Sequence, residues 1–306
     1  MTHVTDVDLL AHPAPNRSAL AARGFVARLS RSQLLLSDVR RAGPDEFRAK
    51  AHWPRTRPAF DRCAPGTERH DPLLVAETLR QLGIYLPLRC YGVAADSRVL
   101  IEELRFEIDP DPDGASRPYQ GTEVTCTAAV DRTGPNAGAD KLRSLGLKIR
   151  LSAGGREFAR AEGVARMLSP AAYRAVRTRR TGLPAAESPR LTPVDPGRVG
   201  VRRPEDVLVA VDARGAVRIA PGDPNHPFFR EHPSDHMTGM VLIGAVQQTA
   251  ALHANEPSTR LRSCSMRALR FTEPTPAATV EFGPDGRFEI RQHGTVTATG
   301  EAEFEL

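Results

Sequence analysis

A segment that occurs twice is the feature of this 306-residue sequence that most constrains its fold. Two apolar stretches, Pro72 to Leu86 and Gly239 to Leu252, align with each other along the chain. The aligned polar positions are Glu77 with Gly244, Arg80 with Gln247 and Gln81 with Gln248. A second match, Leu104 to Phe106 with Leu269 to Phe271, follows at nearly the same offset. Two landmarks with similar offsets predict a tandem repeat of one structural unit.

Both apolar stretches are predicted to be helices. Leucine and alanine recur at every third position between residues 73 and 82, which is typical of an apolar helix face. Asp71 before Pro72 predicts the start of the first helix, because a carboxylate accepts the first free N–H groups and proline fits the first helical position. Pro87 is expected to end this helix, and Thr238 is expected to cap the second.

Runs of β-branched or alternating residues flank each helix and predict strands. They cover 32–38, 99–108, 122–130, 145–151 and 158–167 in the first copy, and 206–212, 260–271, 279–282, 287–292 and 295–304 in the second. Loops rich in Pro, Gly, Asp and Asn separate them. One long helix among several antiparallel strands predicts an α+β fold, a sheet wrapped around a central helix. Two copies resemble a double hot-dog arrangement.

The repeat divides the chain into two predicted modules, residues 1–168 and 201–306. The segment between them, 169–200, is rich in proline and arginine. This composition predicts an exposed linker, with a short helix over residues 171–176. Since hot-dog modules normally pair, two copies in one chain predict a pseudo-dimer that is a monomer in solution.

Composition excludes several classes of function. The formal net charge is +5, but no nucleic-acid-binding motif accompanies it. No apolar run is long enough for a transmembrane helix, and the first residues lack the pattern of a secretory signal. The four cysteines form no Cys-x-x-Cys pair, so neither a disulfide framework nor a zinc site is expected. We expect a cytoplasmic protein without membrane, nucleic-acid or metal partners and without a bound cofactor.

Glu77 interrupts the apolar face of the first predicted helix, and Arg80 follows within contact distance. Burial would raise the pKa of this carboxyl and Arg80 would lower it, a combination that suits proton transfer near neutral pH. His70, just before the helix, is a candidate second acid or base, or an orienting group. Free N–H groups at the helix start are candidates to polarise a carbonyl. The alternative is a surface ion pair beside a loop histidine.

The segment from Asn225 to Phe229, with His232, Asp235 and His236 after it, resembles the active-site segment of β-hydroxyacyl-carrier-protein dehydratases, which are hot-dog enzymes. His232 and His236 compete for the place of the dehydratase histidine. Gly244 stands where the helix acid would be, and glycine has no proton chemistry, so a dehydratase is not expected. The histidine spacing fits no strong zinc pattern, and a structural turn is the competing interpretation.

Two stretches resemble the AfsA-like family of tandem hot-dog proteins from actinomycetes. They are His70-Asp71-Pro72-Leu73-Leu74 through Glu77-Thr78-Leu79-Arg80-Gln81, and His232-Pro233-Ser234-Asp235-His236 through Gly239-Met240-Val241-Leu242. The resemblance implies an acyltransferase that moves a β-ketoacyl group from acyl carrier protein to dihydroxyacetone phosphate, toward a γ-butyrolactone or butenolide signal. It implies Glu77 as the base and Arg80 as a phosphate ligand. The expected substrate-binding residues are Asp71, Gln81, His232, Asp235, His236 and Gln247.

The second helix departs from the family pattern, because Gly244 and Gln247 replace the usual acid and cation. The first-helix site alone is therefore expected to work. Two other functions stay open. One is a non-catalytic regulatory protein that binds an acyl chain or lactone. The other is a thioesterase-like hydrolase in which Glu77 activates water.

Overall fold

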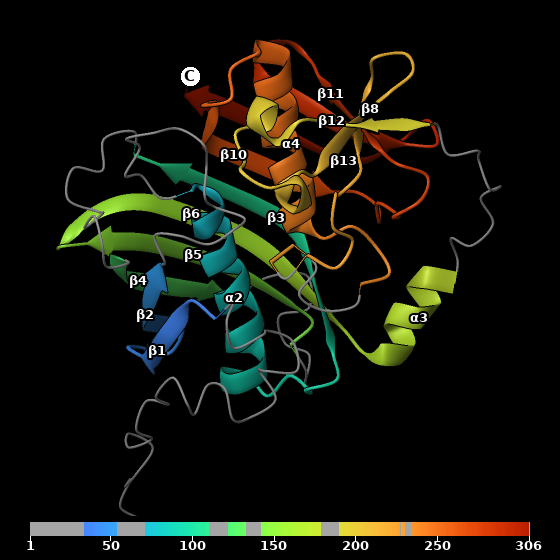
Figure 1. Cartoon of the computed structure of the whole chain (residues 1–306). Helices are drawn as coiled ribbons and strands as arrows, with labels where there is room; N and C mark the ends of the chain where they lie inside the picture. Colours follow the sequence, from blue (N-terminus) through green and yellow to red (C-terminus); the bar gives the residue numbers. More distant parts are fainter. Residues whose placement is uncertain are drawn as a thin grey trace, which may run out of the picture.

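The computed structural model describes residues 34–53, 71–109, 122–132, 142–178, 190–226, 228–229 and 234–305. Its first half contains β1 (Leu36–Arg41), β2 (Glu46–Trp53), α2 (Leu73–Cys90), β3 (Arg98–Ile108), β4 (Thr122–Asp131), β5 (Ser144–Ala153) and β6 (Arg156–Leu168). The strands of this half form a sheet against which α2 lies (Figure 1).

The second half repeats this plan. It contains β8 (Val209–Asp212), β9 (Val217–Ile219), α4 (Gly239–Ala254), β10 (Arg260–Ala268), β11 (Thr279–Phe282), β12 (Arg287–Gln292) and β13 (Thr295–Glu305). Three short 3₁₀ turns, Pro196–Val199, Pro204–Asp206 and Pro284–Gly286, connect its elements. Between the halves lie α3 (Pro170–Thr178) and β7 (Leu191–Pro193).

Within the described residues, all strands join one antiparallel sheet in the order β1-β2-β4-β5-β6-β3-β10-β13-β12-β11-β9-β8-β7. The order on either side of the β3–β10 pair is the same when read outward from it, apart from the extra edge strand β7. The two halves meet where Arg105 of β3 lies opposite Ser265 of β10. This mirrored topology confirms the predicted α+β fold with two helix-and-sheet units.

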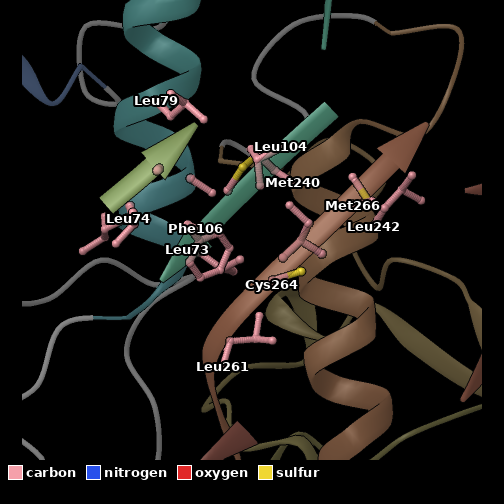
Figure 2. Packing of buried hydrophobic residues seen from close by; sticks show 14 of the residues in the cluster. Leu73, Leu74, Leu79, Leu104, Phe106, Met240, Leu242, Leu261, Cys264 and Met266 are labelled. Atoms are coloured by element: carbon pink, nitrogen blue, oxygen red, sulfur yellow. The ribbon is translucent and has the colours of Figure 1, made fainter. Parts of the chain in front are cut away.

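The core is continuous across the two halves. Figure 2 shows side chains of α2, β3, β10 and α4 in one apolar cluster, among them Leu104 and Met240. Nearly every residue of α2 and of α4 is buried, so each helix is covered all round rather than along one face. A polar side chain on either helix therefore loses its contact with water, which is unfavourable in free energy unless the side chain is hydrogen-bonded.

The predicted helix starts are confirmed. Asp71 Oδ1 accepts a hydrogen bond from Leu73 N at 2.8 Å, and the Thr238 hydroxyl accepts one from Val241 N at 3.4 Å. The predicted end at Pro87 is wrong, because α2 continues through Pro87 to Cys90. Proline removes one backbone hydrogen bond from a helix, but Pro87 is buried here, and Leu88 and Cys90 of the extra turn pack against the core.

Several strand limits differ from those predicted. The strand β2 was not predicted, although its residues alternate strictly between exposed and buried. Its buried positions include two alanines, which carry little strand preference. The first strand of each copy begins later than predicted, at Leu36 in β1 and at Val209 in β8, and β10 ends at Ala268.

The second match of the repeat, Leu104 to Phe106 with Leu269 to Phe271, does not join residues at equivalent positions in the two halves. Leu104 lies inside β3 and is 4 % exposed, whereas Leu269 follows the end of β10 and is 47 % exposed. The loop between helix and strand is shorter in the second half, which moves the strand toward the N-terminus. The helix alignment is the one that the fold supports.

The segment between the modules is folded where it is described. The predicted helix is confirmed as α3, and β7 pairs with β8 at the edge of the second half. The module limits at 168 and 201 stay a prediction. No helix among the described residues is long and apolar enough to cross a membrane.

Candidate functional site

The Glu77 carboxylate lies in the second turn of α2 and is wholly buried. Arg80 donates to both of its oxygens, from Nε to Oε2 at 2.7 Å and from Nη2 to Oε1 at 2.8 Å. Gln81 Nε2 donates to Oε1 as well, at 2.7 Å. The predicted contact between Glu77 and Arg80 is therefore confirmed, and it is a buried two-pronged pair rather than a surface ion pair.

Gln81 connects this pair to the sheet. Its Oε1 accepts hydrogen bonds from Leu35 N at 2.9 Å and from Leu36 N at 3.3 Å. Both ends of the amide are thus used inside the protein, one on the backbone before β1 and one on Glu77. We call Glu77, Arg80 and Gln81 the α2 polar cluster.

Gln248 makes the matching contacts in the second half. Its Oε1 accepts from Leu208 N at 2.7 Å, and its Nε2 donates to Asp206 O at 2.9 Å. The Oε1 atoms of Gln81 and Gln248 therefore have equivalent backbone partners, which supports the alignment of the two helices, although their Nε2 atoms donate to different groups. Gln247, the counterpart of Arg80, is buried in α4.

The position matching Glu77 is not open space. A β-carbon on Gly244 would lie 2.5 Å from Leu208 Cδ1 and 3.3 Å from Phe229 Cε1. The second half has therefore lost both the acid and the room for it.

A buried histidine holds the backbone at Phe229. His226 Nδ1 accepts from Phe228 N at 3.1 Å and from Phe229 N at 3.2 Å. Since Nδ1 is an acceptor, Nε2 carries the proton, and it lies 2.9 Å from Asp206 Oδ1. Within the described residues Asp206 Oδ2 has no hydrogen-bond partner. His226 thus acts as a structural residue of the second half.

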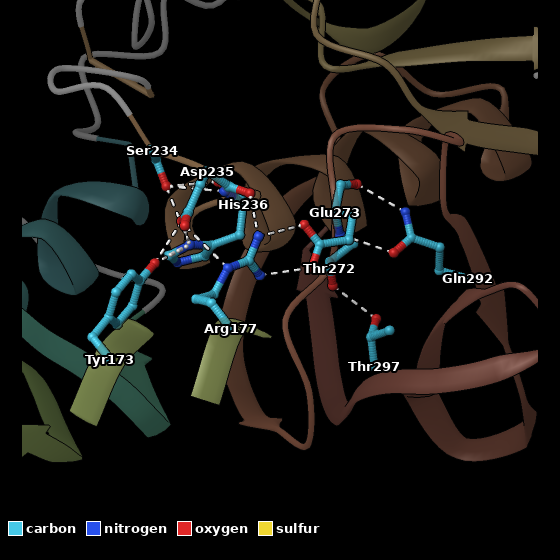
Figure 3. A network of polar contacts seen from close by, with 9 residues as sticks. All are labelled: Tyr173, Arg177, Ser234, Asp235, His236, Thr272, Glu273, Gln292 and Thr297. Carbon is cyan, nitrogen blue, oxygen red and sulfur yellow. Dashed lines mark hydrogen bonds and ion pairs between the residues drawn. The ribbon is translucent and has the colours of Figure 1, made fainter. Parts of the chain in front are cut away.

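A second polar cluster lies just before α4, where Asp235 and His236 meet α3 (Figure 3). His236 Nδ1 lies 2.9 Å from Asp235 Oδ1 and 3.3 Å from the Tyr173 hydroxyl. Tyr173 donates its hydrogen to Asp235 Oδ1. Arg177 Nε lies 3.0 Å from Asp235 Oδ2. We call Tyr173, Arg177, Asp235 and His236 the α3–α4 cluster.

Arg177 is itself held by two residues that follow β10, Phe271 and Glu273. It donates to both carboxylate oxygens of Glu273, at 2.6 and 2.8 Å, and its guanidinium lies 4.8 Å from the Phe271 ring centre. The His236 ring packs on the same phenyl ring at 4.7 Å. The Phe271 ring thus packs against both Arg177 and His236.

The pKa values of this cluster are shifted. Burial lowers the pKa of His236, and Asp235 opposes that effect in part. Burial acts to raise the pKa of Asp235, but the hydrogen bonds from Tyr173 and His236 and the charge of Arg177 bring it below its usual value. The pKa of Tyr173 is raised by burial and by its bond to Asp235. At neutral pH the cluster therefore contains a neutral imidazole and an ionised carboxylate.

The structure places five of the predicted site residues in these two clusters, and Gln247 is buried in α4 outside both. Asp71 caps α2, while His70 and His232 lie outside the described residues. Tyr173, Arg177 and Glu273 were missed by sequence reasoning. A signal was present for two of them, because Tyr173 lies in the predicted helix and Arg177 follows directly after it, and residues four apart share one helix face.

A sheet wrapped around a buried helix, twice in one chain, is the double hot-dog fold. The family model described as the A-factor biosynthesis hotdog domain, AfsA, matches residues 11–169 and 184–282. The chain belongs to this family.

Curated relatives are similar along most of the chain. A protein of Streptomyces virginiae named 2-oxo-3-(phosphooxy)propyl 3-oxoalkanoate synthase is 28 % identical over 247 residues, 80 % of each chain. A Streptomyces griseus protein of the same name is 33 % identical over 236 residues, 76 % of this chain and 75 % of the relative.

Solved structures also resemble the chain. The 12:0-ACP thioesterase from Umbellularia californica matches with a TM-score of 0.47 and 11 % identity, covering 85 % of this chain and 97 % of that one. An acyl-ACP thioesterase from Bacteroides thetaiotaomicron matches with a TM-score of 0.45 and 13 % identity, covering 85 % and 98 %.

Proposed function

We propose that this protein transfers a 3-oxoacyl group from a thioester to the hydroxyl of dihydroxyacetone phosphate. The product is a 2-oxo-3-(phosphooxy)propyl 3-oxoalkanoate, the compound in the name of its relatives. One observation carries the proposal: relatives with this name match the chain over both halves, at 28 % and 33 % identity.

In this scheme the acyl group arrives on the phosphopantetheine of acyl carrier protein, in the cytoplasm. The transfer exchanges a thioester for an oxygen ester and changes no oxidation state. The acyl donor and the hydroxyl acceptor are therefore the only reactants, and the ester and the free thiol are the products. We propose a precursor of a γ-butyrolactone or butenolide signal as the eventual product.

The scheme uses one site in each chain. The α2 polar cluster keeps its acid and its cation, whereas Leu208 and Phe229 fill the corresponding space beside Gly244. The role of Glu77 as base stays a prediction from the sequence. Arg80 is engaged with Glu77 through Nε and Nη2, so a part for Arg80 in holding phosphate requires that the pair open.

Mass spectrometry of the reaction products tests the function. Purified protein is incubated with a β-ketoacyl thioester and dihydroxyacetone phosphate, and the ester, the free acid and the thiol are measured. The proposal expects the ester and one equivalent of thiol. Free acid without ester would show a hydrolase. No product across several acyl chain lengths would overturn the enzyme and favour a binding protein.

The conservative variant Glu77→Gln belongs to the same experiment. It keeps the shape of the side chain and one acceptor oxygen, but it removes the charge. Loss of ester in a variant that stays folded would support Glu77 as the base. Unchanged ester formation would show that another group takes the proton.

A further inference from the structure

Among the residues that the structure describes, polar groups contact the imidazole of His236 through Nδ1. This nitrogen faces Asp235, Tyr173 and Ser234. Among the described residues no polar atom contacts Nε2. The side chain is 22 % exposed, so part of it is open to solvent.

We propose that Asp235 and His236 form the proton-transfer pair of the acyl transfer, and that Tyr173 and Arg177 of α3 position this pair. The inference rests on the proposed function and assigns its base. His236 Nε2 takes the hydroxyl proton of the acceptor as the acceptor oxygen bonds to the thioester carbon. The carbon–sulfur bond then breaks, and the same proton passes from Nε2 to the departing sulfur.

The tautomer supports this assignment. A carboxylate at 2.9 Å from Nδ1 selects the form with the proton on Nδ1. Nε2 then carries the lone pair, as a general base requires. The Tyr173 hydroxyl uses its hydrogen on Asp235 Oδ1, so it does not compete for that tautomer.

Arg177 fixes the carboxylate from the other side. It contacts Asp235 Oδ2 through Nε and donates to the Asp235 backbone carbonyl from Nη2 at 2.9 Å. Glu273 holds the guanidinium in place. These contacts make Tyr173 and Arg177 positioning residues, because they act on the imidazole through Asp235.

Glu77 is less suited to take a proton. Its side chain is 1 % exposed, and Arg80 and Gln81 donate to both of its oxygens. His236, in contrast, has a partly exposed side chain, and no polar atom of the described residues contacts its Nε2. The α2 polar cluster instead joins the helix to the backbone before β1 through Gln81.

Burial favours the neutral form of His236 at pH 7, against the effect of the nearby carboxylates. Asp235 and Glu273 act to raise the pKa of His236, while burial and Arg177 lower it, and the net shift is downward. Tyr173 is the other titratable group in contact with the ring. Ester formation is therefore expected to fall on acidification, as the imidazole becomes protonated below its usual pKa.

The test compares kcat/KM for ester formation between pH 5 and 8, using a small acyl thioester so that carrier docking plays no part. The variants are His236→Gln, Asp235→Asn and Tyr173→Phe, each checked for folding by circular dichroism. His253→Gln and Arg174→Ala are the controls, since His253 lies near the end of α4 and Arg174 on the exposed face of α3.

We expect His236→Gln to lower kcat/KM by about 100-fold or more and to abolish the acid limb. Asp235→Asn is expected to lower the rate and move the acid limb to lower pH, because it removes a charge that raises the pKa of His236. Tyr173→Phe should lower the rate less, and both controls should match wild type.

Failure of the base assignment and failure of the proposed function would give different results. Full activity and an unchanged acid limb in folded His236→Gln, with activity lost in Glu77→Gln, would overturn this assignment and leave the acyltransferase intact. Absence of ester with wild-type protein would overturn the proposed function itself.

Discussion

The ring of Phe229 occupies the space that a side chain on Gly244 would need. The gap to a β-carbon there would be 3.3 Å, and Leu208 approaches the same point more closely. Phe229 is in turn held by the hydrogen bond from its N–H to His226. The loss of an acid on α4 is thus accompanied by packing that closes its place.

Gly244→Ala is expected to destabilise the protein, although alanine usually favours a helix. The added methyl must push Leu208 and Phe229 within a packed core, at a cost of about 1–3 kcal/mol. Gly83→Ala in α2 is the matched control. A β-carbon there meets no atom within 4 Å, so it should stabilise by about 0.5–1 kcal/mol. Denaturant unfolding measures the change in stability of both variants. Equal changes would contradict the conclusion that Leu208 and Phe229 fill the space beside Gly244.

Removing one member of the Glu77–Arg80 pair is expected to cost more than replacing both. Glu77→Gln leaves the Arg80 charge without its carboxylate in a largely buried place, at a cost of about 3 kcal/mol. The double variant Glu77→Gln with Arg80→Met removes both charges and should recover part of that loss. A double-mutant cycle of unfolding free energies checks it. Additive effects would mean that the two side chains do not interact.

Acidification is expected to destabilise the protein through His236. Its pKa in the folded state lies below the unfolded value of about 6.5. The unfolded chain therefore binds the proton more readily, and this contribution to stability is lost as pH falls through 6.5 toward the folded pKa. The free energy of unfolding, measured from pH 7.5 to pH 5, should fall less steeply in His236→Gln. Identical slopes would show that His236 is not the group responsible.

The chain is expected to be a monomer. Hot-dog units pair through their sheets, and here β3 and β10 make that pair within one polypeptide. Light scattering should give the mass of a single chain, 33.3 kDa. A stable dimer would contradict the prediction.

The parts of the fold that sequence predicted are those with a local signal. The apolar runs and the cap residues Asp71 and Thr238 gave both helices, and alternation gave most strands. The alignment of Gln81 with Gln248 was correct. Both are buried, and each needs a backbone hydrogen-bond partner, so both copies keep glutamine at this position. The strand β2 was not predicted, because its alanines and arginine have little preference for strands. Its side chains nevertheless alternate between exposed and buried.

The site was harder to predict because its contacts join distant segments. Glu77 and Arg80 are three residues apart, so their contact was readable from the sequence. Tyr173 lies in the segment between the modules and Asp235 in the second module, and only folding brings α3 against the loop before α4. The closure beside Gly244 was equally hidden, since glycine itself carries no sign of what fills its neighbourhood.

The β3–β10 junction has a consequence for how this protein can evolve. In a dimer of identical subunits, every substitution appears on both sides of the symmetry axis. A covalent link between the two copies lifts that constraint, so that one half could keep Glu77 while the other acquired a packed glycine. Assembly also becomes independent of concentration, because the two partners of the junction always arrive together. A chain present at very low copy number would still fold with both halves in place.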